Sequence, residues 1–202
     1  MAAIVAALHG SRLEKVVVAS TYGARPGERC GDLSVLYELE QGVLASGIPA
    51  VVNRGAYYFS NWDHSIDTAR DDGLLVSMFP ADLELPMVAP ADLGAAGARR
   101  LLEPVDATGI HFVEGPARYT PGDVAAMFAR ALDRPVEVSE IPPDEHRSTF
   151  LSMGFSDAAA EAYARMTDVT RRRDVELPDG PERGTTDLQT YVDDLVTPDS
   201  TR

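Results

Sequence analysis

Polar residues close two neighbouring apolar runs of the sequence, and they are the residues best placed to contact a ligand. Ser20, Thr21 and Tyr22 close the first run, and Arg54 and Gly55 close the second. Open α/β sheets place their ligands just beyond the carboxyl ends of their strands. If both runs are strands of one parallel sheet, these five residues meet at its ligand-binding edge.

These residues also have plainer structural interpretations. Ser and Thr are common in the turns that follow strands, which is enough to explain Ser20 and Thr21. Arg54 also fits a buried ion pair with a carboxylate such as Glu40. Both alternatives stay open at the level of the sequence.

A loop dense in aromatic residues follows the second run. It contains Tyr57, Tyr58, Phe59, Asn61 and Trp62. Flat rings there could stack on a planar ligand, and the Asn61 amide could orient it. The alternative is an aromatic plug between two lobes of the protein.

The surrounding pattern predicts the elements that would position these residues. The run at residues 16–20 is a short, wholly apolar strand, residues 33–46 have helical spacing and end at Gly47, and residues 48–54 form the next strand. Strand, helix and strand in this order predict a parallel βαβ unit. Strands and helices alternate further along the chain, so the predicted class is α/β.

Composition excludes several classes of function. Eighteen Lys and Arg against 32 Asp and Glu give a net charge of −14, which disfavours nucleic acid and anionic membranes as partners. Cys30 is the single cysteine, and no His or Cys residues have metal-ligand spacing, so we expect no disulfide, no metal and a reducing cytoplasm. The apolar residues 1–8 are too short for a membrane span.

A set of short motifs resembles the NmrA-like family of atypical short-chain dehydrogenase/reductases. The motifs lie, in the family's order, at residues 15–23, at Glu40 ahead of 47–49, at 53–62, at 85–94, at 115–125 and at 183–188. Together they extend over residues 2–196. Each motif is weak alone, but their order is specific.

The resemblance implies a partial Rossmann-like parallel sheet with a smaller C-terminal α+β substrate lobe. Residues 1–62 would be the C-terminal part of a dinucleotide-binding domain. Residues 63–196 would be a mixed lobe whose strand near 110–113 returns to the main sheet, and 197–202 would be a flexible tail.

The resemblance further implies an NAD(P)-dependent oxidoreductase, or reductase-like protein, that acts on a small carbonyl, quinone or imine. Ser20, Thr21, Tyr22, Arg54 and Gly55 would contact the cofactor, and the aromatic loop would contact the substrate. Because the family includes redox-responsive regulators, a non-catalytic NAD(P) sensor is one alternative. A remnant that binds no cofactor, and has no small-molecule partner, is another.

The family's glycine-rich G-x-x-G-x-x-G loop, which binds the cofactor's pyrophosphate, has no counterpart in this sequence. The resemblance therefore implies a chain truncated, or naturally shortened, at its N-terminus, with little or no NAD(P) binding of its own. The strand at 16–20 would then be an exposed apolar sheet edge. Unless the missing half is supplied, we expect such an edge to make the chain poorly soluble or a homo-oligomer.

Tyr37 is the candidate catalytic residue by the same resemblance. Standard members of the wider superfamily carry a Lys four residues after a Tyr on this helix, and the Lys lowers the pKa of the Tyr for proton transfer. Here the fourth residue is Gln41, which carries no charge. A packing role for Tyr37 is therefore the main alternative to a proton-transfer role.

Overall fold

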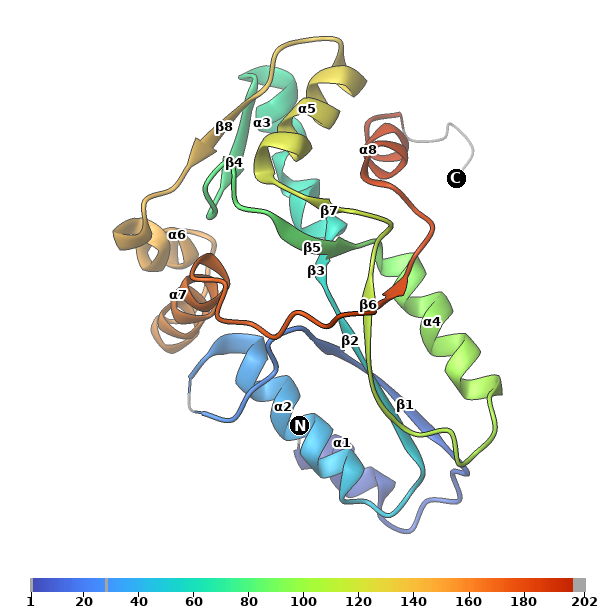
Figure 1. Ribbon diagram of the computed structural model, residues 1–202. Helices are drawn as coiled ribbons and strands as arrows, with labels where there is room; N and C mark the ends of the chain where they lie inside the picture. The colour runs from blue at the N-terminus through green and yellow to red at the C-terminus, as the bar shows by residue number, and fades with distance from the viewer. Residues whose placement is uncertain (1, 28, 198–202) are drawn as a thin grey trace.

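The computed structural model describes residues 2–27 and 29–197, and a parallel sheet lies at its centre (Figure 1). The sheet contains β1 (Val16–Thr21), β2 (Ala50–Gly55), β6 (Gly109–Glu114) and β9 (Glu182–Arg183), in the order β1-β2-β6-β9. All of its pairings are parallel. Every residue of β2 is buried, as expected for an unbroken apolar run covered on both faces. The predicted α/β class is confirmed.

Helices cover both faces of this sheet (Figure 1). These are α1 (Ala2–Leu8) and α2 (Gly31–Leu44) on one face and α4 (Pro90–Leu102) on the other. Val18, Leu39 and Val43 are the buried core beneath α2. A Cβ at position 42 would lie 2.5 Å from a methyl group of Val5, so Gly42 is what lets α1 pack closely on α2.

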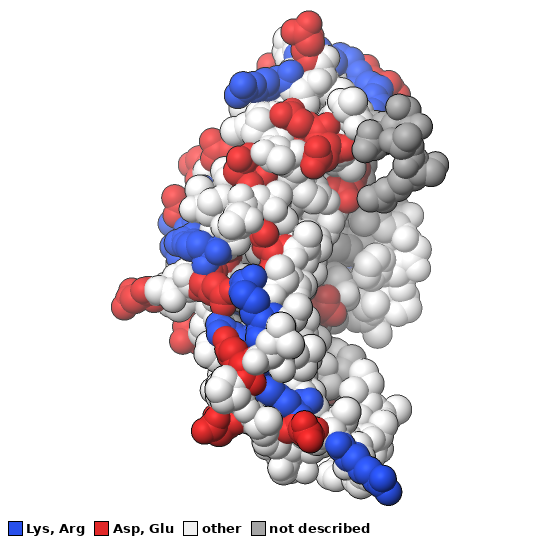
Figure 2. Space-filling model, turned by 90° about the vertical axis from the view of Figure 1, so that its right-hand side faces the viewer, with Lys and Arg blue, Asp and Glu red and all other residues white. Residues whose placement is uncertain are grey.

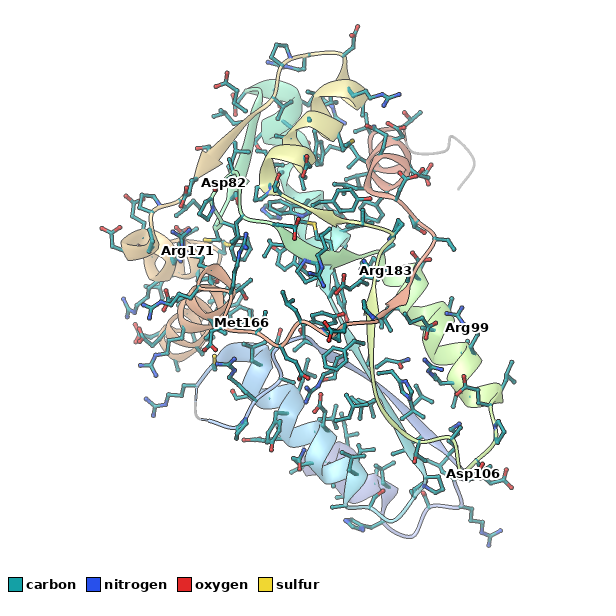
Figure 3. The ribbon with its side chains drawn as sticks, viewed as in Figure 1. Asp82, Arg99, Asp106, Met166, Arg171 and Arg183 are labelled. Atoms are coloured by element: carbon teal, nitrogen blue, oxygen red, sulfur yellow. The ribbon has the colours of Figure 1, made fainter. Side chains whose placement is uncertain are left out.

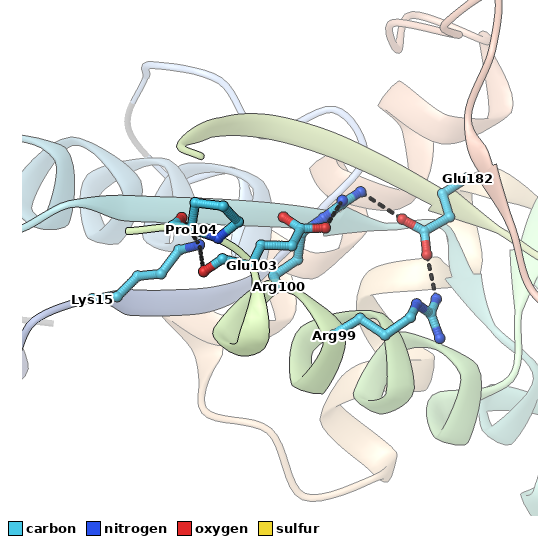
Figure 4. Close-up of polar contacts among 6 residues, drawn as sticks. All are labelled: Lys15, Arg99, Arg100, Glu103, Pro104 and Glu182. Carbon is cyan, nitrogen blue, oxygen red and sulfur yellow. Dashed lines mark hydrogen bonds and ion pairs between the residues drawn. The ribbon is translucent and has the colours of Figure 1, made fainter. Parts of the chain in front are cut away.

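Hydrogen bonds and ion pairs connect the end of α4 to the sheet (Figure 4). Lys15, which precedes β1, donates to the carbonyl of Pro104 at 3.0 Å. Arg100 donates to Glu103 at 2.7 Å and to Glu182 of β9 at 2.5 Å, and Arg99 also pairs with Glu182. On the face that carries α4, acidic and basic side chains are interspersed and separated by uncharged residues (Figure 2).

A second lobe lies beyond the carboxyl ends of the main strands (Figure 1). Its elements are β3 (Tyr57–Tyr58), η1 (Phe59–Ser65), α3 (Ile66–Asp71), β4 (Leu74–Ser77), β5 (Leu85–Val88), β7 (Arg118–Tyr119), α5 (Pro121–Leu132), β8 (Glu137–Glu140) and α8 (Leu188–Val196). Its core is built around Phe59, Leu75, Met87, Phe128 and Leu188. Part of the aromatic loop thus belongs to this core.

Three further elements, η2 (Pro143–Glu145), α6 (His146–Ser152) and α7 (Asp157–Arg171), follow the second lobe, and α7 packs on α2. Residues 172–187, which we call the C-terminal strap, then run from α7 to β9 and on to α8. Arg171, the last residue of α7, and Arg183, in β9, flank the part of the strap that runs between these two elements (Figure 3). Asp174 of the strap pairs with Arg25 at 2.6 Å, and Val175 packs against Gly23 at a distance that leaves no room for a Cβ.

None of the helices in the described part of the chain is both long and apolar enough to cross a bilayer. The tail predicted for residues 197–202 lies, beyond Thr197, outside the described residues.

β1 is the outermost strand of the sheet within residues 2–27 and 29–197, and none of its six residues is charged. The backbone N–H groups of Val16 and Tyr22 donate toward β2. Since alternate residues of a strand present their backbone groups to opposite sides, Val17, Ala19 and Thr21 present theirs to the free edge. Such an edge can pair with a second copy of the chain.

We expect the protein to self-associate through this edge. Replacing the exposed Ala19 with lysine places a charge in the pairing register, which opposes edge-to-edge pairing. Size-exclusion chromatography with light scattering should show an oligomer for the unmodified chain and a shift toward monomer for Ala19→Lys. A monodisperse monomer of the unmodified chain contradicts this prediction.

Candidate functional site

A cleft of about 900 Å³ lies between the main sheet and the second lobe, where β1 and β2 end. Most of its surface is apolar, and its volume is in the range of small-molecule sites. Residues from the sheet ends, the second lobe and α6–α7 contribute to it, among them Thr21, Ala56, Phe79, Phe150, Tyr163 and Met166. Met166 projects from α7 onto Gly31 at the start of α2 (Figure 3).

Six of the residues singled out in the sequence line this cleft: Thr21, Tyr22, Tyr57, Tyr58, Asn61 and Trp62. The ring centroid of Tyr57 lies 5.7 Å from that of Trp62 and 5.6 Å from that of Phe79. Burial raises the pKa of the Tyr57 phenol well above its usual value, and burial also raises the pKa of Tyr58. Both phenols therefore stay neutral at any physiological pH.

Ser20 and Arg54 instead meet at a buried carboxylate. The Arg54 guanidinium donates twice to Glu40, from Nε at 3.0 Å and from Nη2 at 2.7 Å, and the Ser20 hydroxyl donates to the same carboxylate. Glu40 is fully buried. The ion pair that the sequence left as the alternative for Arg54 is therefore present, whereas a cofactor contact stays a prediction.

The other three predicted residues do not line the cleft. A Cβ at position 55 would lie 2.7 Å from Leu93, so Gly55 permits close packing of α4 on β2. Phe59 is fully buried in the core of the second lobe. Tyr37 is half-buried on α2.

Tyr22 belongs to a second buried network, centred on Glu114 at the end of β6. Its hydroxyl donates to the Glu114 carboxylate at 3.0 Å. Arg118 donates to the same carboxylate from Nε and Nη2, and Arg183 donates from Nη1 at 2.8 Å. Burial, followed by the nearby Glu114 charge, raises the pKa of the Tyr22 phenol far above its usual value. Tyr22 is therefore held as a hydrogen-bond donor and is poorly suited to release a proton.

A lysine beside the cleft would be the usual means of lowering the pKa of a tyrosine there. The chain has a single lysine, Lys15, and its ammonium group donates to backbone carbonyls at the end of α4. Lys15 precedes β1, at the opposite end of the strand from the cleft. The protein thus has no Tyr–Lys pair for general acid catalysis.

Several cleft residues were not singled out in the sequence. They include Asp32, Asp63, His64, Glu84, Arg118 and Tyr163. Asp32 accepts a hydrogen bond from Tyr163, 131 residues further along the chain, at 3.1 Å. Neither spacing nor periodicity brings such residues together, so only the fold reveals this part of the site. Within the described residues, no group of three His, Cys, Asp or Glu could hold a metal ion.

Solved structures with the same fold include an NADPH-dependent quinone oxidoreductase, a triphenylmethane reductase and a transcriptional regulator. An NADPH-dependent quinone oxidoreductase from Escherichia coli, in complex with NADPH, superimposes with a TM-score of 0.75 at 20% identity, over 96% of this chain and 70% of that one. Triphenylmethane reductase from Citrobacter sp. gives 0.73 at 14% identity, over 96% of this chain and 68% of that one. The chain has their Rossmann-type fold.

The negative transcriptional regulator NmrA, in complex with NADP, also shares this fold, with a TM-score of 0.63 at 16% identity over 90% of this chain and 64% of that one. The NmrA-like resemblance is therefore confirmed at the level of the fold. No protein-family model and no curated protein sequence matches the chain.

Proposed function

We propose that the chain carries the nicotinamide-facing and acceptor-binding parts of an NAD(P)-dependent reductase. The observation that carries the proposal is the aromatic cleft at the carboxyl ends of β1 and β2, in a fold whose solved examples include NADPH and NADP complexes. The nicotinamide would lie against Thr21 and Tyr22. A small carbonyl, quinone or imine would lie among Tyr57, Tyr58 and Trp62.

Hydride transfer in such a site depends mainly on how the cofactor and the acceptor are held. Tyr22 is committed to Glu114, and the single lysine is remote, so the proton that follows the hydride would come from solvent.

A chain without the glycine-rich loop should bind NAD(P) weakly by itself. Free Cys30 and a nicotinamide cofactor both suit a reducing cytoplasm, where we place the protein.

A non-catalytic redox sensor is the second candidate, and the missing Tyr–Lys pair favours it. It would bind the nicotinamide in the same place but would not transfer hydride. The acceptor cleft would then be a site for a regulatory ligand rather than for a substrate.

Trp62, the only tryptophan of the chain, provides a local reporter because it lines the cleft. NADPH at high concentration should quench its emission, and a quinone or imine panel should be reduced, as followed by loss of nicotinamide absorbance. Asn61→Ala should raise the acceptor KM about threefold to tenfold, because one hydrogen bond is lost. Quenching without turnover favours the sensor. If NADPH does not quench Trp62 and no acceptor is reduced, the proposal is contradicted.

A further inference from the structure

Three carboxylates line the cleft, and none of them forms a salt bridge among the described residues. They come from three elements or their flanks: Asp32 from α2, Asp63 from η1 and Glu84 from the residues before β5. No ion pair within 4.0 Å is formed by any of the three in the described chain. Glu114 and Glu140, by contrast, are paired with arginines.

The basic side chains that line the cleft do not balance these carboxylates. Arg118 directs Nε and Nη2 onto the buried Glu114, which Arg183 also contacts, so these three groups together carry one positive charge against the three carboxylates of the cleft. Arg173 is exposed at the end of α7, and His64 is exposed on η1. The formal net charge of the whole chain, which includes these groups, is −14. The potential in the cleft is therefore negative.

Two of the carboxylates are held in place by tyrosines. Tyr163 donates to Asp32 at 3.1 Å, and Tyr191 donates to both oxygens of Asp63, at 2.9 and 3.1 Å. Burial raises the pKa of Asp63, which shows that its negative charge is only partly solvated. A cation in the cleft would lower the cost of this charge.

The aromatic residues decide which kind of cation fits. Tyr57, Tyr58, Trp62 and Phe79 present rings to a mainly apolar cleft. The face of an aromatic ring attracts a cation, and a flat ligand with a delocalised charge makes that contact without losing strong hydration. A compact ammonium or metal ion would lose its hydration shell in the same surroundings.

We propose that the cleft selects planar aromatic cations over neutral or anionic molecules of the same shape. This inference rests on the proposed function only in taking the cleft as the acceptor site. A cationic aromatic ring, such as an iminium or a ring quaternised at nitrogen, is also electron-poor and thus a good hydride acceptor. The structure assigns the charge preference to Asp32, Asp63 and Glu84.

Three acridines provide a matched set of probes: N-methylacridinium, neutral acridine and acridine-9-carboxylate. Each is titrated at mildly alkaline pH and low salt, with quenching of Trp62 emission as the readout and no cofactor present. We expect the cation to bind roughly tenfold more tightly than the carboxylate, and we expect added salt to reduce this ratio.

The double variant Asp32→Asn/Glu84→Gln should lose most of the preference, while its affinity for neutral acridine stays unchanged. Both side chains are exposed, so the fold should tolerate the change. The control is Asp106→Asn, which removes a charge between α4 and β6, far from the cleft (Figure 3), and should keep the preference.

Each other outcome overturns a different part of the account. Equal affinity for the three probes removes the charge selection but leaves the cleft as a ligand site. A preference that survives in the double variant shows that Asp32 and Glu84 do not set it, which also overturns the inference. If no probe quenches Trp62, the cleft is not a ligand site and the proposed function fails with it.

Discussion

Replacing Glu114 with alanine is expected to lower the free energy of unfolding by about 3 kcal/mol. The fully buried carboxylate accepts hydrogen bonds from Tyr22, Arg118 and Arg183, and it joins the ends of β1 and β6 to β7 and β9. Its removal leaves two guanidinium groups close together without an anion. The expected loss lies at the lower end for a buried ion pair because the Arg118 and Arg183 side chains remain 25% and 44% exposed. Urea unfolding followed by circular dichroism measures it.

Glu182→Ala is the matched control, because Glu182 also pairs with two arginines, Arg99 and Arg100. Arg99 is 58% exposed and Arg100 keeps its pair with Glu103, so the expected loss is smaller, about 1 kcal/mol. Equal losses for the two variants would show that burial at Glu114 does not decide the cost. The cleft should also change in Glu114→Ala, since Tyr22 and Arg118 line it.

The elements near the site were predictable because each is encoded by a local pattern. The mainly apolar runs at 16–20 and 48–54 predicted β1 and β2, and the helical spacing at 33–46 predicted α2 within about two residues at each end. The start of α5 carries a similar local signal, because the N-cap residue Thr120 accepts from the N–H of Asp123 and is followed by proline. These signals act over a few residues, and a sequence displays them directly.

The site itself was only partly predictable. The aromatic loop follows β2 without interruption, so its position at the sheet edge could be inferred from the strand. Tyr163 and Met166 reach the cleft because α7 packs on α2, which is a contact between segments far apart in the chain. Glu114 could have been singled out, since it closes a strand and is followed by Arg118 four residues later. Its second cationic partner, Arg183, lies 69 residues further on and left no local signal.

The two interpretations of Arg54 make different predictions for Glu40. If Arg54 serves the ion pair, Glu40→Ala should lower the free energy of unfolding by about 3–5 kcal/mol, because a guanidinium with only 10% of its side chain exposed loses its main partner. The remaining acid, Glu176, lies 3.6 Å from Nη1 but is 66% exposed and gives little compensation. Thermal or urea unfolding measures this loss.

The double variant Glu40→Leu/Arg54→Met removes both charges and fills the space with apolar side chains. It should recover most of the stability, because replacing a buried ion pair with packed apolar groups is often nearly neutral. About 1 kcal/mol should remain lost, since the Ser20 hydroxyl no longer has its acceptor. A double variant as unstable as Glu40→Ala would contradict this account. If it is stable but NADPH no longer quenches Trp62, then Arg54 also contacts the cofactor, since a purely structural ion pair would leave that quenching unchanged.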